Sequence, residues 1–375
     1  MFNNYFKIAL RNIRRYKVYS FINILGLAIG IAGCLVIFLF VTDELSYDKF
    51  HENGNRLFRV MKIDYDNATG KKENRSKFLP PAMGPELERA YKEIKFMSRH
   101  MWGVGAVCYQ DKIFRETIQF VDAHFFQMFS FPLISGNPAT VLSNDNSLVL
   151  THSIARKYFE TENPIGKIIT INYGNASKDY IVTGVAEDTP RHSTIQFDIL
   201  VHIKNLSIAT NNPEVLNDWN RWYFPFYVQL DEHAAPQQFE HKLHQFCMQY
   251  FESKIQDLRS LGSWTRDDLP FSFELQPISE MYIDSRGLMP SVILSAIAIM
   301  IFIIASVNFT NISIGLSSVR HREVGMRKVL GADRRHIISQ FWGEAILISL
   351  LAMSFSLLIT ELLLPFFNSI WDKQL

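Results

Sequence analysis

Residues 319–345 read VRHREVGMRKVLGADRRHIISQFWGEA, the one dense block of charge in the C-terminal third of the chain. The block lies between two long apolar runs. The positive-inside rule places a short basic loop between two membrane spans in the cytoplasm. The stretch therefore predicts a membrane helix on each side of it and sets the orientation expected for the rest of the chain. Its cations are Arg320, Arg322, Arg327, Lys328, Arg334 and Arg335.

Three apolar runs are long enough to cross a bilayer, for which about 20 residues suffice at ~1.5 Å of rise per residue. The sequence predicts transmembrane helices over residues 18–42, 287–317 and 337–365. In the third run, Glu344 is either a functional carboxylate within the membrane or, as its closeness to the basic loop favours, part of an ion pair at the cytoplasmic edge. This makes the chain an α-helical integral membrane protein.

Two glycines in the first run, Gly26 and Gly30, have the spacing that lets a second helix approach closely. The alternative is that glycine is simply tolerated in membrane helices, and the sequence leaves both interpretations open.

The segments that flank the first run predict opposite sides of the membrane. Residues 1–17 alternate apolar and basic positions at helical spacing, which predicts a cytoplasmic amphipathic helix at the interface. Asp43, Glu44 and Asp48 follow the run and are interpreted as a topological flank and helix start, not as a catalytic pair. Residues 43–286 are therefore predicted to be extracytoplasmic, residues 318–336 a cytoplasmic loop, and residues 366–375 an extracytoplasmic tail.

The extracytoplasmic stretch mixes strand and helix patterns without a βαβ repeat, which predicts an α+β domain. A hairpin is expected where Gly174-Asn175 separates two alternating runs. The expected strands are residues 57–64, 104–109, 113–121, 147–151, 167–173, 179–185, 194–202, 223–230 and 271–277, and the expected helices are residues 80–91, 124–129, 153–159 and 236–251.

Composition and motifs exclude several classes of function. The net charge is +1 and no basic stripe with aromatics runs through the central stretch, so nucleic acid is not an expected partner. No phosphate-binding loop, nucleophile elbow or zinc-protease motif occurs, so neither ATP binding by this chain nor catalysis is expected. His241 and His244 lack a third ligand, and no metal site is predicted. Cys108 and Cys247 are either a disulfide or two free thiols.

Three stretches together resemble the MacB/FtsX superfamily of ABC transporter permeases, in the form common in Bacteroidetes-type bacteria. They are FKIALRNIRRYKVYSFINILGLAIGIA (residues 6–32), the pair GNPATVLSNDNSLVLTHSIARKYFETENPIGKIITI and DYIVTGVAEDTPRHSTIQFDIL (residues 136–171 and 179–200), and REVGMRKVLGADRRHI (residues 322–337). The pair is similar to the MacB-type periplasmic core domain. A family half-permease has four helices, so the three found here suggest part of a longer permease or a truncated product.

The resemblance implies that the basic loop couples this chain to a separate ATPase subunit, which would use the ATP. The coupling residues would be Arg322, Glu323, Gly325, Arg327, Lys328, Gly331 and Ala332. For any single cation, the positive-inside rule is the better explanation, whereas Glu323 gains nothing from topology. The helices would transmit motion to the extracytoplasmic domain. They would not form a tunnel for substrate.

The resemblance also implies a location and partners. The chain would be a multi-pass protein of the bacterial inner membrane, with a second permease half or copy and an outer-membrane or periplasmic adaptor as candidate partners. The cargo could be a macrolide-like drug, a peptide or a lipoprotein. Two alternatives remain open: an FtsX-like regulator that activates a cell-envelope hydrolase, and a receptor with an extracytoplasmic ligand domain.

Overall fold

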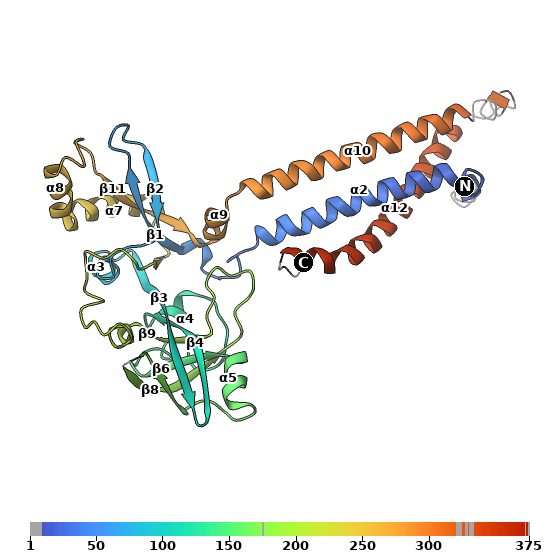
Figure 1. Cartoon of the computed structure of the whole chain (residues 1–375). Coiled ribbons are helices and arrows are strands. Elements are labelled where there is room, and N and C mark those ends of the chain that lie inside the picture. Colours follow the sequence, from blue (N-terminus) through green and yellow to red (C-terminus); the bar gives the residue numbers. More distant parts are fainter. Residues whose placement is uncertain are drawn as a thin grey trace. The chain divides into compact units, whose positions relative to one another are not determined.

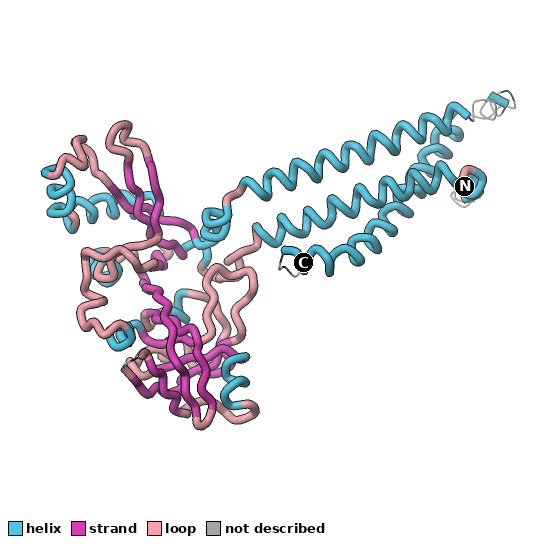
Figure 2. The backbone as a smooth tube through the Cα atoms, in the orientation of Figure 1, coloured by secondary structure: helices cyan, strands magenta, loops and turns pink. Residues whose placement is uncertain are grey.

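A computed structural model describes residues 10–174, 176–319, 325–326, 329, 334–371 and 373 of the chain (Figure 1). The chain forms two compact units. Met1–Leu45 and Arg286–Leu375 make up the membrane unit, and Ser46–Ser285 make up the second unit, here called the β domain. The secondary structure separates along the same boundary, because the magenta strands all lie in the β domain (Figure 2).

The membrane unit contains three long helices within the part of the chain that the structure describes: α2 (Lys17–Glu44), α10 (Met289–Val319) and α12 (Arg334–Trp371). Each has the length and hydropathy of a membrane span, which confirms the three membrane helices expected from the sequence. The third runs past its expected end at residue 365, because Pro365 is accommodated inside the helix, as proline often is in membrane helices. Residues 10–15 are helical and lead through a turn at Tyr16 into α2; residues 1–9 lie outside the described part.

α10 and α12 both pack along α2. At the centre of the bundle, one alanine from each helix is buried: Ala28 of α2, Ala305 of α10 and Ala352 of α12. Small side chains let helix backbones approach closely, which replaces the hydrophobic driving force that is missing in lipid.

The β domain is built around a mixed sheet with short helices on its faces. Its strands are β1 (Leu57–Tyr65), β2 (Lys72–Ser76), β3 (Ile94–Tyr109), β4 (Lys112–Val121), β5 (Leu133–Ser135), β6 (Ser147–Thr151), β7 (Ile168–Asn172), β8 (Ser177–Ala186), β9 (Ile199–His202), β10 (Phe226–Leu230) and β11 (Phe271–Pro277). Its helices are α3 (Met83–Ala90), α4 (Phe125–Met128), α5 (His152–Phe159), α6 (Leu206–Ala209), α7 (Pro236–Tyr250), α8 (Glu252–Ser260) and α9 (Met281–Arg286).

Strand β3 is shared by two halves of the domain. Over its first part it pairs with β10, which continues through β1 to β11 in antiparallel order; this is the sheet half. Over its second part it pairs with β4 on one edge and β7 on the other. From β4 the pairing continues through β9, β6 and β8 and returns to β7, so these strands close into a barrel, the barrel half.

Each half has its own core, and a third core joins them. The barrel interior holds one inward-facing cluster from all of its strands, including Phe120 and Tyr180, and α5 packs with it. The sheet half buries one face against α3, α7 and α8. The joining core is rich in phenylalanine and combines residues from both halves, including Leu57, Phe125 and Met281.

Several local expectations are confirmed and several are wrong. The hairpin of β7 and β8 is present, although Asn175 in its turn lies outside the described residues. The strand expected over residues 194–202 begins only at Ile199, because Ser193 and Thr194 bind a carboxylate instead of a neighbouring strand. The expected strand over residues 104–109 begins already at Ile94, and helix α8 was not expected. All three cysteines are free thiols.

Candidate functional site

The predicted coupling residues lie mostly outside the described part of the chain. This applies to Arg322, Glu323, Arg327, Lys328, Gly331 and Ala332. Gly325 is described: it is helical and exposed, and a Cβ built on it would meet no atom of the described residues within 4 Å. Its neighbours Met326 and Val329 are exposed to 64% and 89%.

The two packing glycines of α2 lie against α10. A Cβ on Gly30 would stand 2.6 Å from the Cβ of Ala305, and one on Gly26 would stand 3.2 Å from Nδ2 of Asn308. Nothing lies within 4 Å of a Cβ built on Gly33, one turn along the same helix. Of these three glycines, Gly30 therefore lies in the tightest contact with α10.

We expect Gly30→Leu to separate α2 from α10, because a 2.6 Å contact between two Cβ atoms cannot be accommodated without moving a backbone. Cys34 supplies a readout, since its Sγ lies 3.2 Å from the carbonyl oxygen of Ala298 on α10. In an Ala298→Cys background, oxidation should cross-link positions 34 and 298 efficiently. Gly30→Leu should abolish this cross-link and Gly33→Leu should leave it intact; equal yields in the two variants would contradict the packing.

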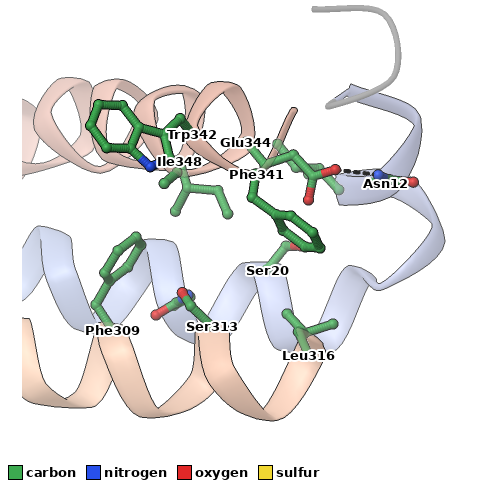
Figure 3. A pocket seen from close by; sticks show the side chains of 12 residues that line it. Asn12, Ser20, Phe309, Ser313, Leu316, Phe341, Trp342, Glu344 and Ile348 are labelled. Atoms are coloured by element: carbon green, nitrogen blue, oxygen red, sulfur yellow. Dashed lines mark hydrogen bonds between the residues drawn. The ribbon is translucent and has the colours of Figure 1, made fainter. Parts of the chain in front are cut away.

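A cavity of about 250 Å³ lies among the three membrane helices and residues 10–15 (Figure 3). Its apolar wall comes mainly from α10 and α12, with Phe309, Phe341 and Trp342 among the lining side chains. The polar lining is Asn12, Ser20, Asn23, Ser313 and Glu344. The cavity thus combines a mostly apolar wall with a small number of polar side chains inside the helix bundle.

Two buried side chains dominate the polar wall. Glu344 is only 9% exposed and accepts hydrogen bonds from Asn12 and, at 3.3 Å, from Gln340. Figure 3 shows the Glu344 carboxylate pointing to Asn12. Asn23 is 1% exposed, and neither its amide nitrogen nor its oxygen has a partner among the described residues. Because an unpaired buried amide is unfavourable, the cavity is suited to hold water beside Asn23.

The C-terminal ends of α2 and α12 are joined by a cluster of charges and aromatic rings. Lys373 donates to Asp43 at 2.5 Å and to Glu44 at 2.7 Å. The ring of Phe40 lies 5.8 Å from that of Phe367 and 5.3 Å from that of Trp371. Asp43 and Glu44 therefore hold two helices together, a role beyond the topological flank that the sequence indicated.

Asp48 does not belong with Asp43 and Glu44, which corrects the acidic cluster expected from the sequence. It lies in the β domain, fully buried, and its carboxylate accepts from Ser193 Oγ at 3.1 Å and from Thr194 N and Oγ1 at 2.9 and 2.6 Å. Burial raises the pKa of Asp48, and these hydrogen bonds oppose that rise. In the sequence, only its larger distance from the apolar run distinguishes Asp48 from Asp43 and Glu44, and this signal is weak.

His241 and His244 are exposed on α7. Among the described residues, no group of three potential metal ligands lies together.

Two family models match the chain. The MacB-like periplasmic core domain matches residues 20–246, and the FtsX-like permease C-terminal domain matches residues 295–375. The first covers α2 and most of the β domain, and the second covers α10 and α12. The order of the two matches follows the order of the structural elements along the chain.

Named relatives agree with these models. The chain is 24% identical over 368 residues to the macrolide export ATP-binding/permease protein MacB of Haemophilus ducreyi, covering 93% of this chain and 47% of that protein. The MacB of Pasteurella multocida is 24% identical over 253 residues, which is 66% of this chain and 35% of that protein. The chain thus spans half or less of the length of these relatives.

A solved structure, the periplasmic region of MacB from Actinobacillus actinomycetemcomitans, aligns with a TM-score of 0.39 at 15% identity and covers 62% of this chain and 94% of that one. The family assignment rests on the two models, the first of which alone covers more than half of the chain. With three apolar helices and a periplasmic core domain of the MacB type, this is a membrane protein, and the chain belongs to the MacB/FtsX-like family of ABC transporter permeases.

Proposed function

We propose that this chain is the permease component of an ABC transporter and that a separate ATPase subunit binds and hydrolyses the ATP. The main support is that one chain carries both the periplasmic core and the FtsX-like permease segment in the order of the family. The named relatives join ATP binding and permease in one protein, of which this chain matches at most about half. No phosphate-binding loop occurs in the sequence, which is why the ATPase is assigned to a partner.

Transport would be driven by movement that the membrane helices transmit to the β domain. The cargo would not pass through a channel between those helices. The 28 residues of α2 and the 31 residues of α10 correspond to about 42 and 46 Å of helix. The hydrocarbon core of a bilayer is only about 30 Å thick. Helices of this length extend beyond the hydrocarbon core into the headgroup regions, so a displacement at one end would be carried to the segments on the other side.

The proposed topology follows from the distribution of cations. Arg11, Arg14 and Arg15 precede α2, and the basic loop at residues 318–336 separates α10 from α12. Both would lie in the cytoplasm, the β domain would lie in the periplasm, and the chain would lie in the bacterial inner membrane. An outer-membrane or periplasmic adaptor, and a second permease half or copy, would complete the transporter, and the cargo would be a macrolide-like drug, a peptide or a lipoprotein.

Co-purification tests the coupling loop. We expect an ATPase with a phosphate-binding loop to co-purify with the wild-type chain in mild detergent. Glu323→Arg and Gly325→Trp should abolish its recovery, because one reverses a charge that topology does not require and the other fills an exposed backbone position. Asp333→Arg introduces the same charge change nearby, outside the proposed set, and should retain the ATPase. Equal recovery with all three variants would show that the loop is only a topological anchor.

A second experiment separates transport from regulation. Deleting the chain and measuring both export and cell-wall cleavage distinguishes the transporter from an FtsX-like activator of an envelope hydrolase. Loss of export with unchanged wall cleavage supports the transporter, whereas the reverse pattern supports the activator.

A further inference from the structure

The segment between α2 and β1 is unusually well held by the β domain. Residues 46–51, here called the joint segment, contain Asp48, whose φ is +57°. A non-glycine residue in this left-handed region is strained and persists only where its surroundings hold it. Its N–H donates to the carbonyl of His192 at 2.9 Å, and its carboxylate accepts the bonds from Ser193 and Thr194 described above.

These partners belong to the barrel half, because residues 192–194 connect β8 to β9. A second set of contacts reaches the joining core. His51 is 4% exposed, and its Nδ1 accepts a hydrogen bond from Ser130 N at 3.1 Å. Its ring lies 5.5 and 5.3 Å from those of Phe129 and Phe131. The joint segment is thus fixed to the barrel half at Asp48 and to the joining core at His51, three residues further on.

A third contact reaches the other half. The ring of Tyr47 stacks on that of Tyr282, with centroids 3.4 Å apart and planes 14° from parallel. Tyr282 is 7% exposed and lies in α9, which follows β11 of the sheet half and leads toward α10 along the chain. The segment that follows α2 and the segment that precedes α10 are therefore bound to each other inside the β domain.

We propose that the joint segment is the element through which movement of α2 changes the arrangement of the two halves of the β domain, with Asp48 as its fixed point. Adjacent residues bind different halves: Asp48 binds the barrel half and Tyr47 binds the sheet half. A shift or rotation of this short segment therefore acts on both halves at once. The proposal rests on the mechanical function proposed above, but the joint itself can be tested without it.

The first test measures the joint alone in the full-length chain in detergent. Spin labels at Glu73→Cys on β2 and Arg115→Cys on β4, both exposed positions, report the distance between the halves after the native cysteines are replaced. Asp48→Ala should broaden the distance distribution. It should also make amide exchange in residues 46–51 about 10- to 100-fold faster, since it leaves buried donors unpaired. Unchanged exchange and distances would overturn the proposal.

Matched variants separate the joint from general damage. Asp48→Asn keeps the shape, tolerates positive φ and retains an oxygen acceptor, so it should largely preserve the joint. Glu52→Ala removes an exposed acid from the adjacent turn and should behave as wild type. If Asp48→Ala does not fold, Thr194→Val carries the test, because it removes one of the carboxylate's hydrogen bonds and keeps the side-chain volume.

The second test adds the ATPase partner and ATP. The wild-type distance between the halves should shift on ATP addition, and Asp48→Ala should lose the shift while hydrolysing ATP at the wild-type rate. A shift that survives in Asp48→Ala overturns the coupling role of Asp48. If wild type hydrolyses ATP without any shift, the mechanical function fails and the coupling role fails with it, while the first test still decides whether residues 46–51 hold the halves together.

Discussion

Phe120→Ala is expected to lower the free energy of unfolding of the β domain by about 3–5 kcal/mol, the cost typical of removing a buried aromatic side chain. Phe120 is fully buried in the barrel core, and its ring packs over Gly103 of the neighbouring strand, where a Cβ would lie 3.1 Å from its Cε2 atom. Because β3 has no side chain at this position, the barrel cannot collapse around the cavity from that side. The loss should therefore fall toward the upper end of the range.

Urea unfolding of a fragment comprising residues 46–285 provides the measurement, since this unit has cores of its own. Phe114→Ala on the same strand is the matched control, because Phe114 is 40% exposed and its loss should cost clearly less. Equal losses in the two variants would show that the barrel interior is not the tightly packed core described above.

Acidification is expected to destabilise the β domain through His51. Burial lowers the pKa of His51 to about 4, whereas an imidazole in the unfolded chain titrates near 6.5. Between about pH 6.5 and 4 the unfolded state binds the additional proton, so stability falls as the pH falls. Above this window the contribution of His51 is fully present, and below it the loss is complete at about 3 kcal/mol, set by the gap between the two pKa values.

The variant His51→Asn isolates this effect. The Asn oxygen can accept the hydrogen bond from Ser130 N in place of Nδ1 and does not titrate in this window. Urea unfolding at pH 7 and pH 4.5 should show a smaller difference for His51→Asn than for wild type, whereas His233→Asn, at an exposed position, should match wild type. An unchanged pH dependence in His51→Asn would exclude His51 as a source of acid sensitivity. Burial of its ring also lowers the pKa of His100 to about 4, which adds a separate contribution.

The membrane helices could be predicted from the sequence because a span leaves a long, charge-free run that no other structure requires. The hairpin of β7 and β8 was likewise visible in local alternation. What could not be predicted was pairing over long separations: β1 lies between β10 and β11, and the parallel pairs of β4 with β9 and β6 with β8 close the barrel. Such register is set by tertiary packing, which local patterns do not encode.

The candidate site likewise has parts that could be predicted from the sequence and parts that could not. The basic stretch and the glycines of α2 could be found from charge and spacing alone. Asp48 could not be distinguished from Asp43 and Glu44, because all three follow the span as acids within six residues. Only the folded β domain separates them, since it brings residues 193–194 to Asp48 across 145 positions of the chain.

Because β3 is shared by the two halves of the β domain, the halves can be completed only one after the other during synthesis. Strands β3 to β9 lie within residues 94–202, so the barrel can close as soon as this stretch has emerged. β1 emerges earlier but pairs with β10 and β11, which end at Leu230 and Pro277. Its residues 62–65 can pair at once with β2, which follows directly in the chain. The rest of β1 waits with open edges while more than 160 further residues are added, a delay that exposes it to non-native pairing. The sheet half is finished only shortly before the residues that become α10 are made, so the part of the β domain that is completed last is followed directly by a membrane helix.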